Sequence, residues 1–490
     1  MKMKYKILKS TIVVFLIGAV AISCSDSFVD VDSFNEDSES FFNSEEDYQS
    51  ALIGAYDLLQ STYLNVMLGE IASDNTLAGG ESATDVPGIQ EVDNMTHNPV
   101  NAQLRDIWSW MFAGVNRANY ILEFKDKTDF SGKEVVIAEA TFLRAYYYFE
   151  LVKWFGDVPL SVDKRLLFGD QDIVERTPKS EVYAQIELDL IFAAANLPAV
   201  QSETGRATKG AAQALLGKVY LYQDKFSEAA TVLEEVITSG PYDLVTDYNS
   251  IFEQEGENNI ESVFEVQYTD VEGAGFGCLQ CSEGNVAVGF NGIRNYTGPD
   301  FDSGFSFNVP TQEAYDAFEA GDIRRDVAVL DIVTWADQTG ATYVEGFEHT
   351  GFYNRKYIAR KGDLNTGDSN LTNPNNYRAI RFADVLLMAA EANNRKSGAD
   401  DIKAQAYLNR VRERAELLPL AATGASLTNA IYDERRVELM GEGHRFFDLV
   451  RTGNAAQAVP GFSAGKNELF PIPSIEIELA GNRWTQNQGY

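Results

Sequence analysis

Residues 210–241 read Gly-Ala-Ala-Gln-Ala-Leu-Leu-Gly-Lys-Val-Tyr-Leu-Tyr-Gln-Asp-Lys-Phe-Ser-Glu-Ala-Ala-Thr-Val-Leu-Glu-Glu-Val-Ile-Thr-Ser-Gly-Pro. Apolar residues recur in this stretch at the spacing of one helix face. Gly217 leaves room for a second helix to approach closely, and Pro241 ends that helix. The stretch therefore predicts two helices that pack tightly against each other.

The same stretch matches the tetratricopeptide pattern, in which small and large residues alternate at fixed positions of a helix pair. The matching positions are Leu216, Gly217, Tyr220, Ala229, Leu233 and Pro241. A looser pair is predicted over residues 381–416, with a turn at 396–398. A single pair cannot bury its own apolar face, so several pairs are expected to stack.

Further segments with helical periodicity surround these pairs, whereas the periodicity fails between residues 242 and 376. Glycine, asparagine and aromatic residues dominate there, and strand-like pieces such as 262–268 alternate with loops. The run 365–376 is predicted to be an exposed loop. The other predicted helices cover residues 45–62, 101–125, 132–155 and 178–197, with a short one over 311–320.

These patterns predict a mostly α fold, in which a tetratricopeptide-like helix-pair scaffold holds a loop-rich insertion with short strands. Structured insertions on a rigid scaffold often carry recognition, so we expect the ligand to bind there. The predicted divisions are a signal peptide (1–23), a tether (24–44), an N-terminal helical scaffold (45–241), the ligand-binding insertion (242–376) and C-terminal helical repeats (377–490).

The amino terminus carries lysines followed by an apolar run from Thr11 to Ile22 and then Ser23-Cys24. The run is far shorter than the roughly 20 residues that a spanning helix needs, so it predicts a secretory signal. Ala-Ile-Ser-Cys resembles a bacterial lipobox, which would make Cys24 a lipidated residue; cleavage by an ordinary signal peptidase is the alternative. The polar, acidic residues after Cys24 predict an extended tether or a surface-export signal.

The formal net charge of −33 disfavours binding to nucleic acid and to anionic lipid heads. Cys278 and Cys281 are a close pair in a glycine-rich loop, which favours a local disulfide in an exported protein. A redox Cys-x-x-Cys site would need a helix amino terminus after a strand, and zinc would need two further ligands. We therefore predict no metal site.

Residues 363–370 resemble a calcium loop but lack the glutamate at the twelfth position, so calcium stays only a possibility and no other cofactor is expected. Gly461-Phe-Ser-Ala-Gly465 matches a nucleophile elbow, yet Pro460 precedes it and no histidine follows it in the chain. No local pattern marks a glycosidase carboxylate pair. We therefore predict that the protein is not an enzyme, with a surface-anchored carbohydrate-active enzyme as an alternative.

Several motifs in order along the chain resemble one family. They are Glu139-Ala-Thr-Phe-Leu-Arg-Ala-Tyr-Tyr-Tyr-Phe149, Phe155-Gly-Asp-Val-Pro-Leu160, Arg381-Phe-Ala-Asp-Val-Leu-Leu-Met-Ala-Ala-Glu-Ala392, Ile431-Tyr-Asp-Glu-Arg-Arg-Val-Glu-Leu-Met-Gly-Glu-Gly-His-Arg-Phe-Phe-Asp-Leu-Val-Arg-Thr-Gly453, Leu469-Phe-Pro-Ile-Pro473 and Gln486-Asn-Gln-Gly-Tyr490. With the lipobox, they resemble the SusD/RagB family of outer-membrane nutrient-binding lipoproteins. The charged residues of 434–451 are expected to pair and to fix how the last helices dock.

The resemblance implies a protein that is lipid-anchored to the outer membrane and faces the exterior. It also implies a lid on a SusC-like, TonB-dependent barrel, which captures oligosaccharide or polysaccharide and passes it inward. The alternatives are that the same lid binds a non-glycan nutrient such as a peptide, or that the protein is purely structural. A deep enclosed pocket would favour the non-glycan nutrient.

Sugar rings stack on flat aromatic side chains, and their hydroxyls pair with polar groups. The candidate stacking residues are Trp335, Tyr296 and Tyr343, which lie inside the insertion. The candidate polar contacts are Arg294 and, after the first helix, Asp74 and Asn75. Trp108, Trp110, Trp154 and Trp484 are expected to serve the core or helix docking.

Overall fold

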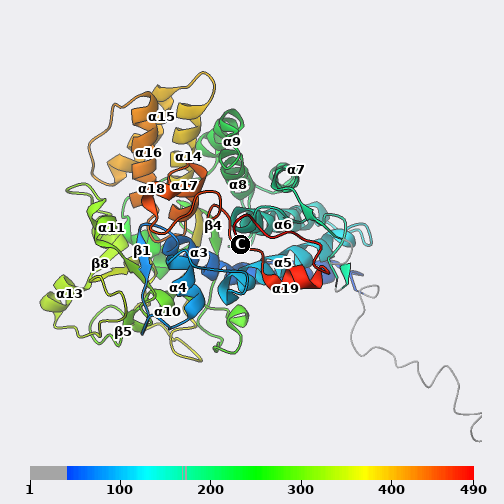
Figure 1. Ribbon diagram of the computed structural model, residues 1–490. Coiled ribbons are helices and arrows are strands. Elements are labelled where there is room, and N and C mark those ends of the chain that lie inside the picture. Colours follow the sequence, from blue (N-terminus) through cyan, green and yellow to red (C-terminus); the bar gives the residue numbers. More distant parts are fainter. Residues whose placement is uncertain (1–40, 168, 171–173) are drawn as a thin grey trace, which may run out of the picture.

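The computed structural model describes residues 41–167, 169–170 and 174–490. The helical scaffold and the insertion form two neighbouring parts, with the helix pairs on one side and α10, α11, α13 and β5 on the other (Figure 1). The predicted lipidation site, Cys24, and the first part of the predicted tether lie outside the described residues.

The scaffold is built from long helices that pack on their sequence neighbours, from α2 and α5 through α9. Residues 240–381 separate α9 from α14, yet these two helices pack directly on each other. The insertion therefore leaves and re-enters a continuous helical layer. The scaffold helices are α2 (Glu45–Asp57), α5 (Ala102–Glu123), α6 (Lys133–Phe155), α7 (Lys179–Asn196), α8 (Lys209–Leu221), α9 (Phe226–Ser239), α14 (Phe382–Arg395), α15 (Asp401–Arg414) and α16 (Gly424–Glu438).

Glycines let the helices of a pair touch. A Cβ atom on Gly217 of α8 would lie 2.4 Å from a methyl carbon of Leu233 on α9. A Cβ atom on Gly114 of α5 would lie 2.6 Å from the ring of Tyr147 on α6. Side chains at either position would push the helices apart, because interiors are close-packed. The predicted mostly α, tetratricopeptide-like architecture is confirmed.

Shorter elements form the insertion and the chain that surrounds it. The antiparallel strand pairs are β1 (Thr76–Ala78) with β7 (Asn308–Pro310), β2 (Val158–Pro159) with β3 (Arg176–Thr177), β4 (Ser262–Val266) with β10 (Tyr377–Arg381), and β8 (Val329–Asp331) with β9 (Phe352–Asn354); β5 (Ile293–Arg294) runs parallel to β6 (Ser303–Gly304). The shorter helices are α3 (Tyr63–Ile71), α4 (Pro87–Asp93), α10 (Ala287–Asn291), α11 (Gln312–Asp316), α12 (Arg325–Ala328), α13 (Ile332–Thr339), α17 (Arg445–Arg451), α18 (Ala455–Ala458) and α19 (Ser474–Leu479).

Two local predictions were wrong. The helix predicted over 45–62 ends at Asp57, and a 3₁₀ turn at Leu58–Thr62 leads into α3. The predicted exposed loop is exposed only up to residue 369, whereas residues 370–376 are buried. Asparagine side chains make this burial possible, because they satisfy backbone groups of neighbouring segments: Asn375 donates to the carbonyl of Phe252, and Asn376 accepts from the amide of Tyr268.

A buried ion cluster joins the insertion to the C-terminal helices. Arg381 donates to Glu261, Glu438 and Glu442 over 2.7–2.8 Å. Arg324 of the insertion bonds to Glu438 as well, and this arginine is fully buried. Of the charged residues predicted to pair between the last helices, Arg435 pairs with Asp448 at 3.2 Å. Arg451 also pairs with Asp448, on its own helix. The remaining members pair outside the set: Glu434 and Glu438 with Arg324 of the insertion, and Arg436 and Arg445 with Asp74.

His97 is buried at the contact between α4 and the end of the chain, where its Nε2 lies 2.7 Å from the hydroxyl of Tyr490. Burial lowers its pKa to about 4; the backbone of Glu91 opposes this shift, and the charge of Lys466 adds to it. An unfolded histidine titrates near 6.5, so the unfolded state takes up this proton first and the protein loses stability as the pH falls from 6.5 to 4. We expect this histidine to contribute roughly 2–3 kcal/mol to that loss. Urea unfolding of wild type and His97→Gln measures this contribution. The difference between their free energies of unfolding should become smaller as the pH falls through this window. A difference that stays constant would contradict the lowered pKa of His97.

In the described parts of the chain, no helix combines the length and apolar character that crossing a membrane requires.

Candidate functional site

Three segments far apart in the sequence meet at one surface of the insertion. The amides of Gly79 and Gly80 donate to the carbonyls of Phe307 and Ser306 over 3.0 and 2.8 Å, and the amide of Phe347 donates to the carbonyl of Gly80 over 2.9 Å. A Cβ atom on Gly79 would lie 2.1 Å from the carbonyl oxygen of Ser306, so this approach needs glycine. The loop after β1 is thereby fixed against the insertion.

Arg294 lies at the centre of this surface. The amide of Val344 donates to its carbonyl over 3.0 Å, and its guanidinium donates to the carbonyl of Phe305 over 2.8 Å. One guanidinium nitrogen lies 3.7 Å from a carboxylate oxygen of Asp85, and both side chains are partly exposed. The pair offers both donors and acceptors at the surface, which is what sugar hydroxyls require.

Two of the predicted aromatic residues form one unit. The indole of Trp335 donates to the hydroxyl of Tyr296 over 2.8 Å, and that hydroxyl donates to the carbonyl of Pro299 over 2.7 Å. Tyr296 is buried, whereas Trp335 on α13 is partly exposed. Tyr296 is therefore a support that orients Trp335, and the tryptophan ring is the face available to a ligand.

Tyr343 is the second partly exposed aromatic residue at this surface, and its ring centroid lies 5.6 Å from that of His349. Burial raises the pKa of Tyr343, and the nearby Glu345 adds to the effect. Burial lowers the pKa of His349. Both rings are therefore uncharged at neutral pH. Tyr296, Trp335 and Tyr343 pack on one small apolar core that is separate from the core of the scaffold.

We refer to Arg294, Asp85, Trp335 and Tyr343 as the platform. A depression of about 680 Å³ lies next to the platform. Phe301 lines this depression, and its ring centroid lies 5.4 Å from that of Trp335. The guanidinium of Arg360 lies over the ring of Phe301, 5.4 Å from its centroid, and pairs with Glu253 at 2.8 Å. Aromatic faces and charged groups thus alternate along this part of the insertion.

Asp74 and Asn75, predicted as polar ligand contacts, have other partners. Burial would raise the pKa of Asp74, but Arg445, which donates to it twice over 2.7 and 2.8 Å, and Arg436 together hold it below its usual value. Asn75 is fully buried and accepts from the Nε of Arg436 over 2.8 Å. The structure uses both residues to clamp α16 and α17 to the end of α3, and it does not bring them to the platform.

Cys278 and Cys281 are joined by a disulfide in an exposed loop. In the segment that resembles a calcium loop, Asp363 accepts from Asn373 over 2.7 Å and from the amide of Arg360 over 3.0 Å. Asp368 accepts from the amide of Phe276. Within residues 41–490, apart from the few positions left undescribed, no three histidine, cysteine or acidic side chains gather as a metal would require.

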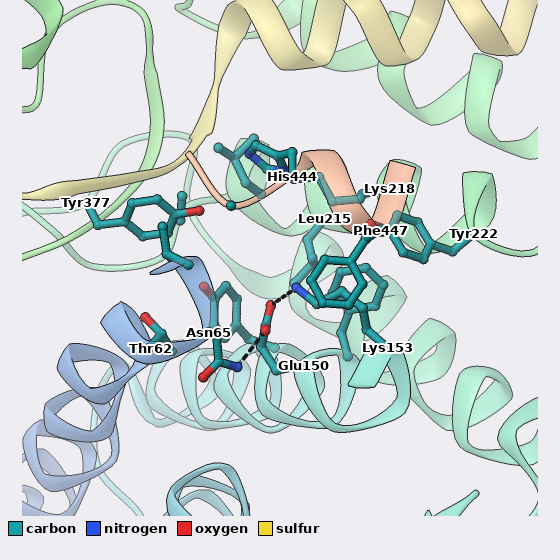
Figure 2. Close-up of a pocket in the computed structure, with 16 residues that line it drawn as sticks. Thr62, Asn65, Glu150, Lys153, Leu215, Lys218, Tyr222, Tyr377, His444 and Phe447 are labelled. Atoms are coloured by element: carbon teal, nitrogen blue, oxygen red, sulfur yellow. Dashed lines mark hydrogen bonds and ion pairs between the residues drawn. The ribbon is translucent and has the colours of Figure 1, made fainter. Parts of the chain in front are cut away.

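A polar cavity lies deep between α3, α6, α8 and α17 (Figure 2). Its volume is about 40 Å³, which is room for a few water molecules and far below the 300 Å³ or more of typical ligand pockets. Its charged groups are already paired: Lys153 with Glu150 at 2.7 Å, and Lys218 with Asp384 at 2.9 Å. The cavity is therefore part of the scaffold.

Comparison with known proteins agrees with this architecture. The model of the SusD family matches residues 255–469, and a model described as starch-binding associating with outer membrane matches residues 27–221. A solved structure described as a laminarin binding SusD-like protein is 38% identical, with a TM-score of 0.84, over 92% of this chain and all of its own. The chain belongs to the SusD family.

Other SusD relatives are similar over nearly their whole length. The surface glycan-binding protein A from Bacteroides thetaiotaomicron, solved in complex with laminarihexaose, is 28% identical with a TM-score of 0.80, over 90% of this chain and 99% of its own. SusD-like protein P2 of Formosa agariphila is 29% identical over 92% of this chain and 94% of its own length. The family resemblance read from the sequence is confirmed.

Sequence reasoning placed Arg294, Tyr296, Trp335 and Tyr343 in the insertion. The structure packs the three aromatic residues on one small core, and the carbonyl of Arg294 accepts from the amide of Val344, which follows Tyr343. It missed Asp85, which reaches this surface from the N-terminal part of the chain. The glycine pair at 79–80 was a usable signal, because adjacent glycines permit close backbone approach.

Proposed function

We propose that this protein captures glycans at the cell surface, with the platform as the contact surface. The observation that carries the proposal is the pairing of partly exposed flat rings, Trp335 and Tyr343, with the Arg294–Asp85 ion pair on a SusD-family chain. Rings bind the apolar faces of sugars, and the ion pair exchanges hydrogen bonds with their hydroxyls.

Laminarin-type glucans are the ligand class that we favour. The laminarin binding SusD-like protein and the laminarihexaose complex are both similar to this chain over at least 90% of its length. A non-glycan nutrient receives less support, because the enclosed cavity of Figure 2 is too small for a peptide or a cofactor-like molecule. We also propose that the protein binds its ligand without catalysing a reaction. The support is that these two relatives are named as binding proteins.

The test is calorimetric titration of the purified full-length protein, in detergent, with laminarihexaose, starch oligosaccharides and an unrelated peptide mixture. We expect saturable binding of laminarihexaose and weaker or no binding of the others. Binding of the peptides alone would overturn the proposal. Binding of starch in place of laminarihexaose would keep the glycan function and overturn the choice of glucan.

We further propose that Cys24 carries the lipid anchor and that the protein delivers its ligand to a SusC-like, TonB-dependent barrel in the outer membrane. The support is the lipobox pattern at Cys24 and the family to which the chain belongs. Metabolic labelling with a palmitate analogue should label wild type but not Cys24→Ala. Affinity purification from outer membranes should recover a barrel protein, and its absence would contradict the proposed delivery step.

A further inference from the structure

Two loops of the insertion are bound to each other at the edge of the platform. Residues 269–282 and 363–372, which we call the paired loops, form a parallel bridge between Ala274 and Gly367. The amide of Asp368 donates to the carbonyl of Ala274 over 2.8 Å, and its carboxylate accepts from the amide of Phe276 over 3.1 Å. The backbone on the amino-terminal side of Phe276, at Ala274, and the amide of Phe276 itself are therefore both bonded to Asp368 of the neighbouring loop.

The disulfide closes the tight turn that follows Phe276. The amide of Cys278 donates to the carbonyl of Gly275 over 3.1 Å, and the amide of Cys281 donates to the carbonyl of Cys278 over 3.2 Å. Beyond the turn, the hydroxyl of Ser282 donates to the carbonyl of Leu371 over 2.8 Å. Glycines at 273, 275 and 277 give this loop many alternative backbone conformations. The crosslink restricts residues 278–281, and the bond from the Cys278 amide to Gly275 links this restricted turn to the segment that carries Phe276.

Phe276 is 59% exposed, which is unusual for a large aromatic side chain held on so constrained a loop. Its ring centroid lies 5.9 Å from that of Phe305. The carbonyl of Phe305 accepts a hydrogen bond from Arg294. Phe305 therefore contacts both Phe276 and the platform. A flat, exposed ring therefore stands beside the polar centre of the proposed glycan site.

We propose that Phe276 is an additional stacking residue that contacts a sugar ring beyond those on the platform, and that the Cys278–Cys281 disulfide holds it in place. This inference rests on the proposed glycan function and extends the same site to longer chains. Stacking on an aromatic ring that is already held in place costs little conformational freedom when the sugar binds.

Two features favour a sugar over a protein partner at this position. Phe276 is the one aromatic side chain of the paired loops, so they offer a single flat face of the size of one sugar ring. The loops also carry exposed acidic groups, including Glu272 and Asp368, that accept hydrogen bonds from hydroxyls. A surface that combines one aromatic face with many acceptors fits a polyhydroxylated ring.

The test compares chain lengths. Full-length wild type, Phe276→Ala and the double variant Cys278→Ser/Cys281→Ser are titrated with laminarihexaose and with laminaritriose. We expect Phe276→Ala to weaken binding of the hexasaccharide about five- to tenfold and to leave the trisaccharide unchanged. The cysteine variant should weaken hexasaccharide binding two- to fivefold, with no further loss when Phe276 is already alanine. Leu364→Ala is the matched control, because this side chain is 66% exposed on the partner loop but has no ring.

Unchanged hexasaccharide affinity in Phe276→Ala would overturn the inference, and so would an equal loss for both chain lengths. An additive loss from the cysteine variant in the Phe276→Ala background would overturn the role given to the disulfide. A wild-type protein that binds neither sugar would overturn the proposed function, and the inference with it. Thermal unfolding of each variant separates a binding effect from a loss of folded protein.

Discussion

Replacing Arg381 with methionine is expected to destabilise the protein by about 3–5 kcal/mol, the largest effect of any single substitution that we predict. Methionine keeps most of the volume of the side chain but removes its charge and its hydrogen bonds. Glu261, Glu438 and Glu442 would then lose the guanidinium that lies within 2.8 Å of each of them. Arg414 stays on Glu261 and Glu438, and Lys356 stays on Glu442, but the buried cluster loses one of its positive charges. The negative charge left uncompensated carries a large desolvation cost.

Arg410→Met is the matched control for this prediction. Arg410 lies 2.9 Å from Asp243, but these side chains are 39% and 63% exposed, and ion pairs in contact with solvent contribute less than about 1 kcal/mol. Urea unfolding at neutral pH, followed by circular dichroism, measures both variants. Equal losses for the two substitutions would show that the buried ion cluster does not hold the insertion to the C-terminal helices.

The double variant Trp335→Ala/Tyr343→Ala is expected to weaken laminarihexaose binding about 50- to 100-fold. Each exposed ring contributes roughly 1–1.5 kcal/mol of stacking, and the two lie on different elements, so their losses should nearly add. Each single variant should lose about tenfold. Calorimetric titration gives these affinities, and thermal unfolding checks that loss of the bond from Trp335 to Tyr296 has not unfolded the insertion.

Trp110→Ala is the control for the double variant. Trp110 is also a partly exposed tryptophan, but it lies on α5 of the scaffold, where its ring is 6.1 Å from that of Tyr63. Its removal should leave the affinity for laminarihexaose unchanged. If Trp110→Ala weakens binding as much as the double variant does, the platform is not the principal sugar contact.

The helical scaffold could be predicted from the sequence because its signals are local. Gly217 and Leu233 are sixteen positions apart, and the pattern that places them together repeats within one helix pair. The burial of residues 370–376 could not be predicted in this way. Their asparagines resemble a solvated loop, yet they bond to Phe252 and Tyr268, more than one hundred positions away. Only the fold brings these partners into reach.

The candidate site was predictable in its location but not in its polar contacts. Aromatic residues within a non-periodic insertion pointed to Trp335 and Tyr343, and the structure places both on one small core. Asp74 was a reasonable expectation from its position after the first helix. Its partner Arg445 lies 371 positions away, so nothing in the local sequence shows that the carboxylate is already occupied. Charged side chains are the hardest to assign from sequence, because their roles depend on distant partners.

The central claim, that sugar binds on the platform of the insertion, is tested most directly by a crystal structure of this protein grown with laminarihexaose. We predict sugar rings stacked on Trp335 and Tyr343, with hydroxyls bonded to Arg294 and Asp85. Sugar density confined to another surface, such as the groove of about 310 Å³ beside Trp108 and Trp484, would contradict the account.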